Sequence, residues 1–248
     1  MMELPGPRRL LIGLIAAFLL FSAPVIADDI TLSFAPAPIT SPWDPEDGDP
    51  GRQHRIGVNA LTIEQDTDNG PSDFSMVGVT YVTKQEGEFF SGGLAAGEDD
   101  AGFVDLFVLN LRWGMEMGDP EGVAYSGSFG TDIFTVDVDG GDDFSSDTII
   151  GTLSAQFSVQ NRIPLADGRM GFTPYATVNA VLFGNGTVNT RFRDAQGTLQ
   201  RNSSDVDVDS TIGLQLGFDL DLGGYSLAAF YQQQDDTEIA SLSFAFEF

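Results

Sequence analysis

Residues 240–248, at the end of the chain, read Ala-Ser-Leu-Ser-Phe-Ala-Phe-Glu-Phe. Successive side chains of an extended strand point to opposite faces. One face therefore carries the apolar residues Leu242, Phe244, Phe246 and Phe248, and the other carries Ser, Ala and Glu. A water-soluble protein would bury such an aromatic stripe in a core, whereas a strand of a membrane barrel displays it to lipid. The stripe predicts a strand with one face against a membrane.

This ending resembles the C-terminal strand of outer-membrane β-barrels of Gram-negative bacteria, whose closing aromatic residue is read by the barrel-assembly machinery. The resemblance implies an outer-membrane location and a chain that ends on the periplasmic side. It implies that Leu242, Phe244, Phe246 and Phe248 form the assembly signal. The partners it implies are the assembly machinery, outer-membrane lipid and lipopolysaccharide. It indicates no particular family.

The beginning of the chain predicts export. Arg8 and Arg9 precede an apolar run, residues 10–21, and Val25-Ile-Ala27 has the small residues of a cleavage site. We interpret residues 1–27 as a cleaved signal peptide. Residues 28–52 are rich in Pro and Asp, which predicts an extended segment, and residues 53–248 are assigned to the barrel.

The longest alternation lies in residues 205–221, Asp-Val-Asp-Val-Asp-Ser-Thr-Ile-Gly-Leu-Gln-Leu-Gly-Phe-Asp-Leu-Asp. It places the apolar residues on one face, which only Ser210 interrupts, and polar residues on the other, as a membrane strand requires. Residues 148–160 and 170–183 alternate less cleanly, and Pro174 predicts a bulge or a strand end. Residues 123–138 fit either one strand or a hairpin that turns near Gly130.

Later segments contain nothing close to the roughly 18 consecutive apolar residues that a membrane-spanning helix needs. We therefore predict an all-β fold, a transmembrane antiparallel up-and-down β-barrel of roughly 8 to 12 strands, with 10 or 12 favoured. Residues 139–147 and 194–204 are expected as outer loops. Residues 65–73 fall on the inner side in this count, and Trp113 is expected in the outer-leaflet belt.

The chain has 37 acidic and 11 basic residues and a net charge of −26, which excludes nucleic acid as a partner. No cofactor is expected. The acidic turn that contains Asp137, Asp139, Asp142 and Asp143 resembles a calcium loop but lacks the residue order of an EF-hand. We favour solvated turns over a surface Ca²⁺ site.

Several charged or polar residues are candidates to line a lumen: Asp207, Asp209, Gln215, Asp219, Arg112 and Arg162. Carboxylates around a lumen would favour small cations. Two alternatives stay open. Asp207 and Asp209 could project beyond the membrane as the stem of a loop, and arginine–carboxylate pairs could fill the interior of a small barrel.

His54 is the single histidine of the chain. A hydrolytic mechanism that needs a histidine base would have to use it. Its two arginine neighbours would lower its basicity, and we favour an exposed rim residue. The favoured function is a non-enzymatic barrel, either a small cation-preferring porin or a structural or surface-interaction protein. The alternatives are a lipid-modifying enzyme that uses His54 and a soluble periplasmic β-protein, which would leave the terminal stripe unexplained.

Overall fold

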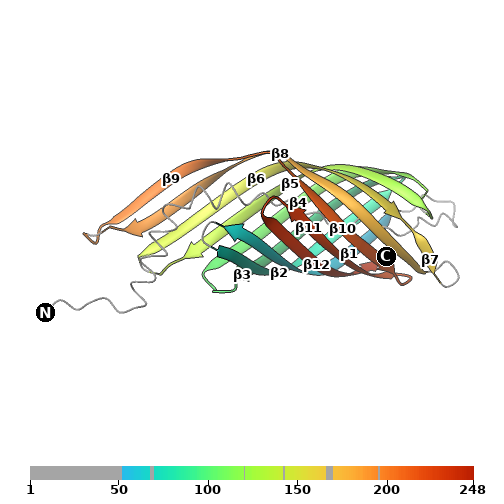
Figure 1. The fold of residues 1–248 in the computed structure, drawn as a ribbon, viewed down its shortest axis with the longest axis horizontal. Helices are drawn as coiled ribbons and strands as arrows, with labels where there is room; N and C mark the ends of the chain where they lie inside the picture. Colours follow the sequence, from blue (N-terminus) through green and yellow to red (C-terminus); the bar gives the residue numbers. More distant parts are fainter. Residues whose placement is uncertain (1–51, 68–69, 120, 142, 166–169, 195) are drawn as a thin grey trace.

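The computed structural model describes residues 52–67, 70–119, 121–141, 143–165, 170–194 and 196–248. The predicted signal peptide and residues 28–51 lie outside these residues. The described chain forms a sheet of twelve strands (Figure 1). They are β1 (Gln53–Thr67), β2 (Gly70–Gln85), β3 (Glu88–Asp99), β4 (Val104–Gly118), β5 (Val123–Asp139), β6 (Phe144–Asn161), β7 (Ile163–Leu165), β8 (Met170–Arg193), β9 (Leu199–Val208), β10 (Thr211–Asp221), β11 (Tyr225–Gln234) and β12 (Thr237–Glu247).

Ten of these strands close into a barrel. Strands β1 to β6 pair in sequence order, β6 pairs with β8, β8 with β10, and β11 and β12 complete the circle. The last strand pairs with the first, Ile56 opposite Phe246 and Ile63 opposite Ile239. All the pairings are antiparallel, so the predicted up-and-down barrel is confirmed. The two remaining strands, β7 and β9, are additions to β8.

The wall has an apolar exterior. Large apolar side chains point outward from every one of the ten barrel strands, for example Val79, Leu94, Phe129, Leu216 and Phe244, each of which is exposed. Their neighbours in sequence are buried inside the barrel. Water would not favour such a continuous apolar surface, but lipid does. Within the described residues, no helix has the length and apolar character needed to cross a membrane.

The two ends of the barrel differ. We call the end that carries His54 and Phe248 the inner end, because both chain termini of the barrel meet there through hydrogen bonds between the backbones of these residues. The outer end is opposite. Beyond it, β9, residues 184–193 of β8 and residues 144–152 of β6 continue as a sheet, which we call the outer extension (Figure 1).

The extension begins at an irregularity of the long strand β8. Its pairing with β6 shifts register beside Leu182, and on its other side β10 gives way to β9 at Asp209 and Ser210. The alternation reverses there, since Val206 and Val208 are buried whereas Ile212 is 71% exposed. The prediction of one continuous face over residues 205–221 is therefore wrong. Because Asp209 and Ser210 lie outside both strands, the apolar residues keep an even spacing in sequence but face inward on β9 and outward on β10.

Several expected connections are strands instead of loops. Most of residues 139–147 and 194–204 belong to β5, β6 and β9, joined by short turns. Residues 65–67 and 70–73 lie at the outer end, not the inner one, because β1 runs outward and β2 returns. Residues 123–138 form one strand, β5. On the β6 side of β8, the pairing with β6 extends as far as Tyr175. The short strand β7 pairs with β8 from Phe172, so Pro174 lies in the gap between the two pairings.

Candidate functional site

Short ion pairs lie in the inner half of the barrel interior. They join Arg55 to Asp219 at 2.7 Å, Lys84 to Glu116 at 2.6 Å, Arg112 to Asp132 at 3.2 Å and Arg162 to Asp221 at 3.0 Å. The side chains of Arg112 and Asp132 are 1% and 0% exposed. Burial of an isolated charge is costly, and a hydrogen-bonded partner offsets that cost. Paired charges therefore fill this half of the interior.

One pair spans the interior. Arg55 lies on β1 and Asp219 on β10, and β11 and β12 separate these strands in the wall. The Arg55 guanidinium also donates to the hydroxyl of Ser226 on β11 and lies 4.0 Å from the carboxylate of Glu247 on β12. This arginine links four strands from the inside.

A second set of polar contacts lies farther toward the outer end. Asn179 on β8 donates to Gln232 on β11 at 3.0 Å, across β10. Its oxygen accepts from the Gln156 amide on β6. Arg112 also donates to the Ser154 hydroxyl at 2.9 Å, and that hydroxyl donates to Asp132 at 3.0 Å. The inner half is thus a network of amides, hydroxyls and charges that joins most of the wall.

The outer half of the interior is mainly apolar, although buried Gln65, Gln232, Gln234 and Thr237 line it on β1, β11 and β12. Along β5, inward-facing Asp132 is followed toward the outer end by Phe134 and Val136, and along β1 Asn59 is followed by Leu61. In the barrel the buried cluster also includes Ile63, Met76, Ala95, Leu106, Val108, Val181 and Ile239, and it continues onto the outer extension with Ile150, Val188, Val206 and Val208. The interior therefore has two layers, a polar one on the inner side and a predominantly apolar one on the outer side. An apolar constriction opposes the passage of ions because they lose water without gaining partners.

The lumen candidates separate between these regions. Arg112, Arg162, Gln215 and Asp219 are all buried in the polar layer, at 5% exposure or less. Asp207 and Asp209 are exposed at the outer end. These two were expected on the lumen side because of the assumed continuous face, and the exchange of faces at Asp209 and Ser210 corrects this.

Sequence reasoning missed Arg55, Lys84, Glu116 and Asp132. Each occupies an inward position of its strand, and Arg55, Glu116 and Asp132 each lie two residues from a buried glycine. They could have been identified as charged residues at the inward-facing positions of alternating strands. Their partners could not be found this way, because Arg55 and Asp219 are 164 residues apart.

His54 lies on the outer surface at the inner end, where the barrel closes. Its Nδ1 is 2.7 Å from the Tyr81 hydroxyl, and its ring stacks on Tyr81 and Phe248 at centroid distances of 6.0 and 5.6 Å. Within the described residues, the His54 side chain makes no hydrogen bond or ion pair with a serine, aspartate or glutamate. The arrangement is that of an interfacial aromatic cluster.

The terminal stripe lies on the exterior of this same seam. Leu242, Phe244, Phe246 and Phe248 are between 42% and 65% exposed. Phe246 stacks on Phe248, and Tyr225 of β11 contacts Phe244 and Phe246. Trp113 lies near the inner end of β4, so its expected place in the outer belt is wrong. The cause is that β4 runs from the outer end to the inner end.

Acidic residues border the apolar exterior at the outer end. Glu98, Asp105, Asp137 and Asp147 lie directly opposite one another on β3, β4, β5 and β6. We call them the carboxylate rim. Desolvation, followed by the charges of Asp147 and Asp105, raises the pKa of Asp137 above its ordinary value. Like charges side by side on neighbouring strands oppose each other's ionisation.

The candidate calcium ligands are dispersed. Asp137 belongs to the carboxylate rim, and Asp139 accepts the backbone N–H of Gly141 at 2.8 Å. Asp143 lies 3.3 Å from Arg193, and Asp142 is outside the described residues. In the part of the chain that the structure describes, no three His, Cys, Asp or Glu side chains are grouped to hold a metal ion.

Neither a protein-family model nor a curated protein sequence matches this chain. Solved structures similar to it include the beta domain of the Bordetella autotransporter BrkA, at 13% identity and TM-score 0.45, covering 80% of this chain and 100% of that one. The translocator domain of the Neisseria meningitidis autotransporter NalP has 10% identity and TM-score 0.42, with coverage of 96% and 99%. Ail of Yersinia pestis has 13% identity and TM-score 0.37, with coverage of 79% and 97%.

The chain is an outer-membrane β-barrel. This assignment rests on its own features: ten antiparallel strands that close on themselves, an apolar exterior, and a polar layer inside. A closed barrel leaves no backbone groups unpaired in the hydrocarbon, which is why this architecture can span a membrane.

Proposed function

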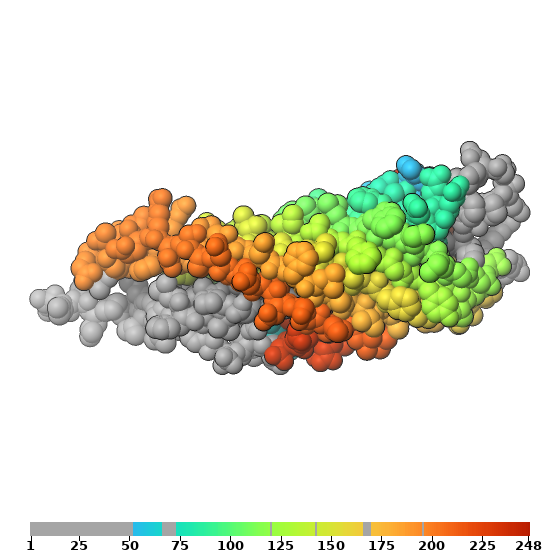
Figure 2. Space-filling model, turned by 90° about the horizontal axis from the view of Figure 1, so that it is seen from above, coloured from blue at the N-terminus to red at the C-terminus, as the bar shows by residue number. Residues whose placement is uncertain are grey.

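We propose that this protein is a non-enzymatic barrel that anchors the outer extension at the cell surface for interaction with external molecules. The observation that carries the proposal is the extension itself. β9 pairs with β8 alone among the described strands, and its residues 199–205 are all exposed. Figure 2 shows it reaching well past the rest of the described barrel at one end. A strand edge of this kind offers backbone donors and acceptors to an extended peptide.

The two-layered interior supports an anchor over an open channel. Ion pairs occupy the inner half, and apolar side chains with exposures of 6% or less occupy most of the outer half. A hydrated ion would have to break the first layer and cross the second. We infer that the main role of the barrel is to anchor the extension to the membrane.

Single-cysteine labelling tests the placement of the extension, because the chain contains no cysteine. Asn202→Cys lies on the exposed part of β9, and Glu121→Cys lies in a turn at the inner end. A maleimide coupled to a large polymer should label Asn202→Cys on intact cells and Glu121→Cys only after the outer membrane is opened. The reverse pattern would place the extension in the periplasm and contradict the proposal.

A narrow cation-preferring pore is the second candidate, and a specific observation favours it. Buried polar atoms such as Asn59 Oδ1, Ser91 Oγ and Thr173 Oγ1 have no protein partner among the described contacts, and such atoms usually bind water. Planar-bilayer recordings of the refolded barrel distinguish the two functions. The anchor predicts no steady conductance, whereas a conductance that rises with salt and selects cations would replace the anchor with the pore.

A further inference from the structure

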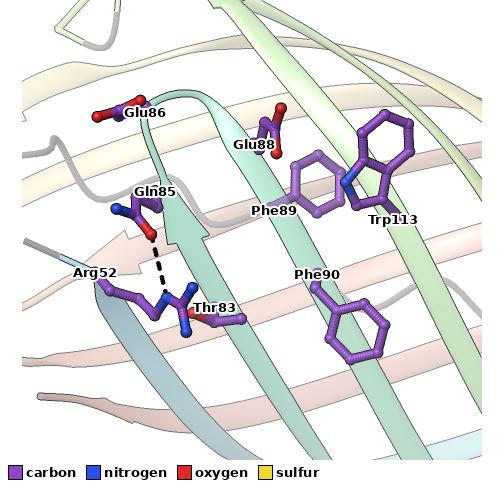
Figure 3. A pocket seen from close by; sticks show the side chains of 8 residues that line it. All are labelled: Arg52, Thr83, Gln85, Glu86, Glu88, Phe89, Phe90 and Trp113. Carbon is purple, nitrogen blue, oxygen red and sulfur yellow. Dashed lines mark hydrogen bonds between the residues drawn. The ribbon is translucent and has the colours of Figure 1, made fainter.

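A pocket of about 430 Å³ lies on the outside of the wall at the inner end, across β2, β3 and β4 (Figure 3). Thr83 and Gln85 face it from β2, since their neighbours Val82 and Lys84 are buried inside the barrel. Phe90 and Trp113 line its other side. The pocket is therefore separate from the interior network.

The pocket contains charges of both signs that have no ionic partner. Arg52 contacts Gln85, with 3.3 Å between its Nε and Oε1, and no carboxylate of the described residues lies within 4.0 Å of it. Glu86 and Glu88 line the pocket from the turn between β2 and β3, beyond Gln85 (Figure 3), and likewise have no basic partner in the described chain. The hydroxyl oxygen of Thr83 is buried and makes no hydrogen bond there. Every cation of the polar layer, in contrast, is paired.

The position of the pocket coincides with the edge of the apolar exterior. Tyr81, Phe90 and Trp113 are 38%, 43% and 50% exposed at this level, as expected for aromatic side chains at a membrane interface. Toward the outer end β2 and β3 continue with Val79 and Leu94, which are exposed to lipid. On the other side is the turn at Glu86 and Gly87. A ligand here would have its polar part in the pocket and its apolar part along the wall.

We propose that this pocket binds the headgroup of an aminophospholipid of the inner leaflet, with a phosphate diester beside Arg52 and Thr83 and a primary ammonium beside Glu86 and Glu88. A guanidinium and a hydroxyl are phosphate donors, and carboxylates accept hydrogen bonds from an ammonium group. Two carboxylates against one arginine disfavour a lipid whose headgroup is only anionic. The acyl chains lie over Phe90 and Trp113. This site is independent of any partner at the cell surface.

Native mass spectrometry of the full barrel tests the proposal. The protein would be released from vesicles of equal parts phosphatidylethanolamine and phosphatidylglycerol, and the lipids that stay bound would be counted. Phosphatidylethanolamine should be retained over phosphatidylglycerol. Arg52→Gln and Glu88→Gln should each reduce that retention about threefold, as expected for loss of one partly exposed ionic contact.

Arg201→Gln and Glu98→Gln are the matched controls, because they make the same changes of charge at the outer end. They should leave the retention unchanged. Heat-modifiable migration on a gel would verify that each variant is folded. Equal or greater retention of phosphatidylglycerol would overturn the proposal, and so would a preference for phosphatidylethanolamine that persists in both pocket variants.

Discussion

The two layers of the interior are built from the same strands by different physics. In the polar layer, Arg112 and Asp132 are fully buried and depend on each other and on Ser154. In the apolar layer, Phe134 and Ile150 have 0% exposure and need only close packing. Hydrogen bonds and charge pairs are directional, whereas apolar contacts are not. One layer should therefore fail when a single partner is lost, and the other should lose stability gradually.

The largest effect should come from breaking a buried pair. Asp132→Ala leaves the Arg112 guanidinium buried without its carboxylate, and we expect a loss of about 3–5 kcal/mol in the free energy of unfolding. A urea titration of the barrel in lipid vesicles, followed by gel mobility, would measure it. The double variant Arg112→Met with Asp132→Leu should recover most of the loss. If the single variant is as stable as the parent, the polar layer does not depend on this pair.

A cavity in the apolar layer should have the next largest effect. Ile150→Ala removes buried methyl groups and should cost about 2–3 kcal/mol, while Ile150→Val should cost about 1 kcal/mol. The same titration measures both. A graded series of this kind would distinguish the two layers. An all-or-none loss with the valine variant would show that the apolar layer is as strictly specified as the polar one.

An exposed pair on the extension provides the contrast to the buried pairs. Arg193 and Asp143 lie 3.3 Å apart, but their side chains are 46% and 75% exposed. Arg193→Ala should therefore change the free energy of unfolding by roughly 0–1 kcal/mol, because water screens such a pair. A loss as large as that of Asp132→Ala would mean that the extension, and not the barrel interior, controls stability.

The smallest effect should be a dependence on pH at the carboxylate rim. The pKa of Asp137 is raised in the folded protein, so its ionisation as pH rises through that value destabilises the fold. Asp137→Asn should stabilise the barrel slightly at neutral pH and lose that advantage in acid. Asp194 provides the opposite case, since its hydrogen bonds to Gln200 and to backbone N–H groups lower its pKa. Asp194→Asn should destabilise at neutral pH, and equal signs for the two variants would contradict this explanation.

Alternation of side chains was enough to predict the strands and the closed barrel, because one face of each strand must meet lipid. It was not enough to predict the faces of β9 and β10. The spacing from Val208 to Ile212 is even, and the only trace of the exchange of faces between them is Ser210, a polar residue at a position of the apolar face. The sequence pattern also did not predict the apolar layer of the interior. Where both faces are apolar, as at Ile133 and Phe134, the alternation that identifies a face disappears.

The positions of single residues in the interior were predictable, but their partners were not. Gln215 and Asp219 could be assigned to the interior because they occupy the polar face of β10. The contact of Asp219 with Arg55 follows only from closure of the barrel, which brings β1 within reach of β10 across two other strands. Such a contact depends on the number of strands and on their register, which local sequence does not encode.

The unbroken backbone of β8 also has a mechanical consequence. This strand of 24 residues runs from the inner end of the barrel to the tip of the extension, and it stays paired with β6 past the bulge. A pull on the tip would load the hydrogen bonds of β8 in shear, many at once, instead of peeling them one after another. The load would then be shared among many hydrogen bonds of the barrel wall, so the barrel would resist it as one unit.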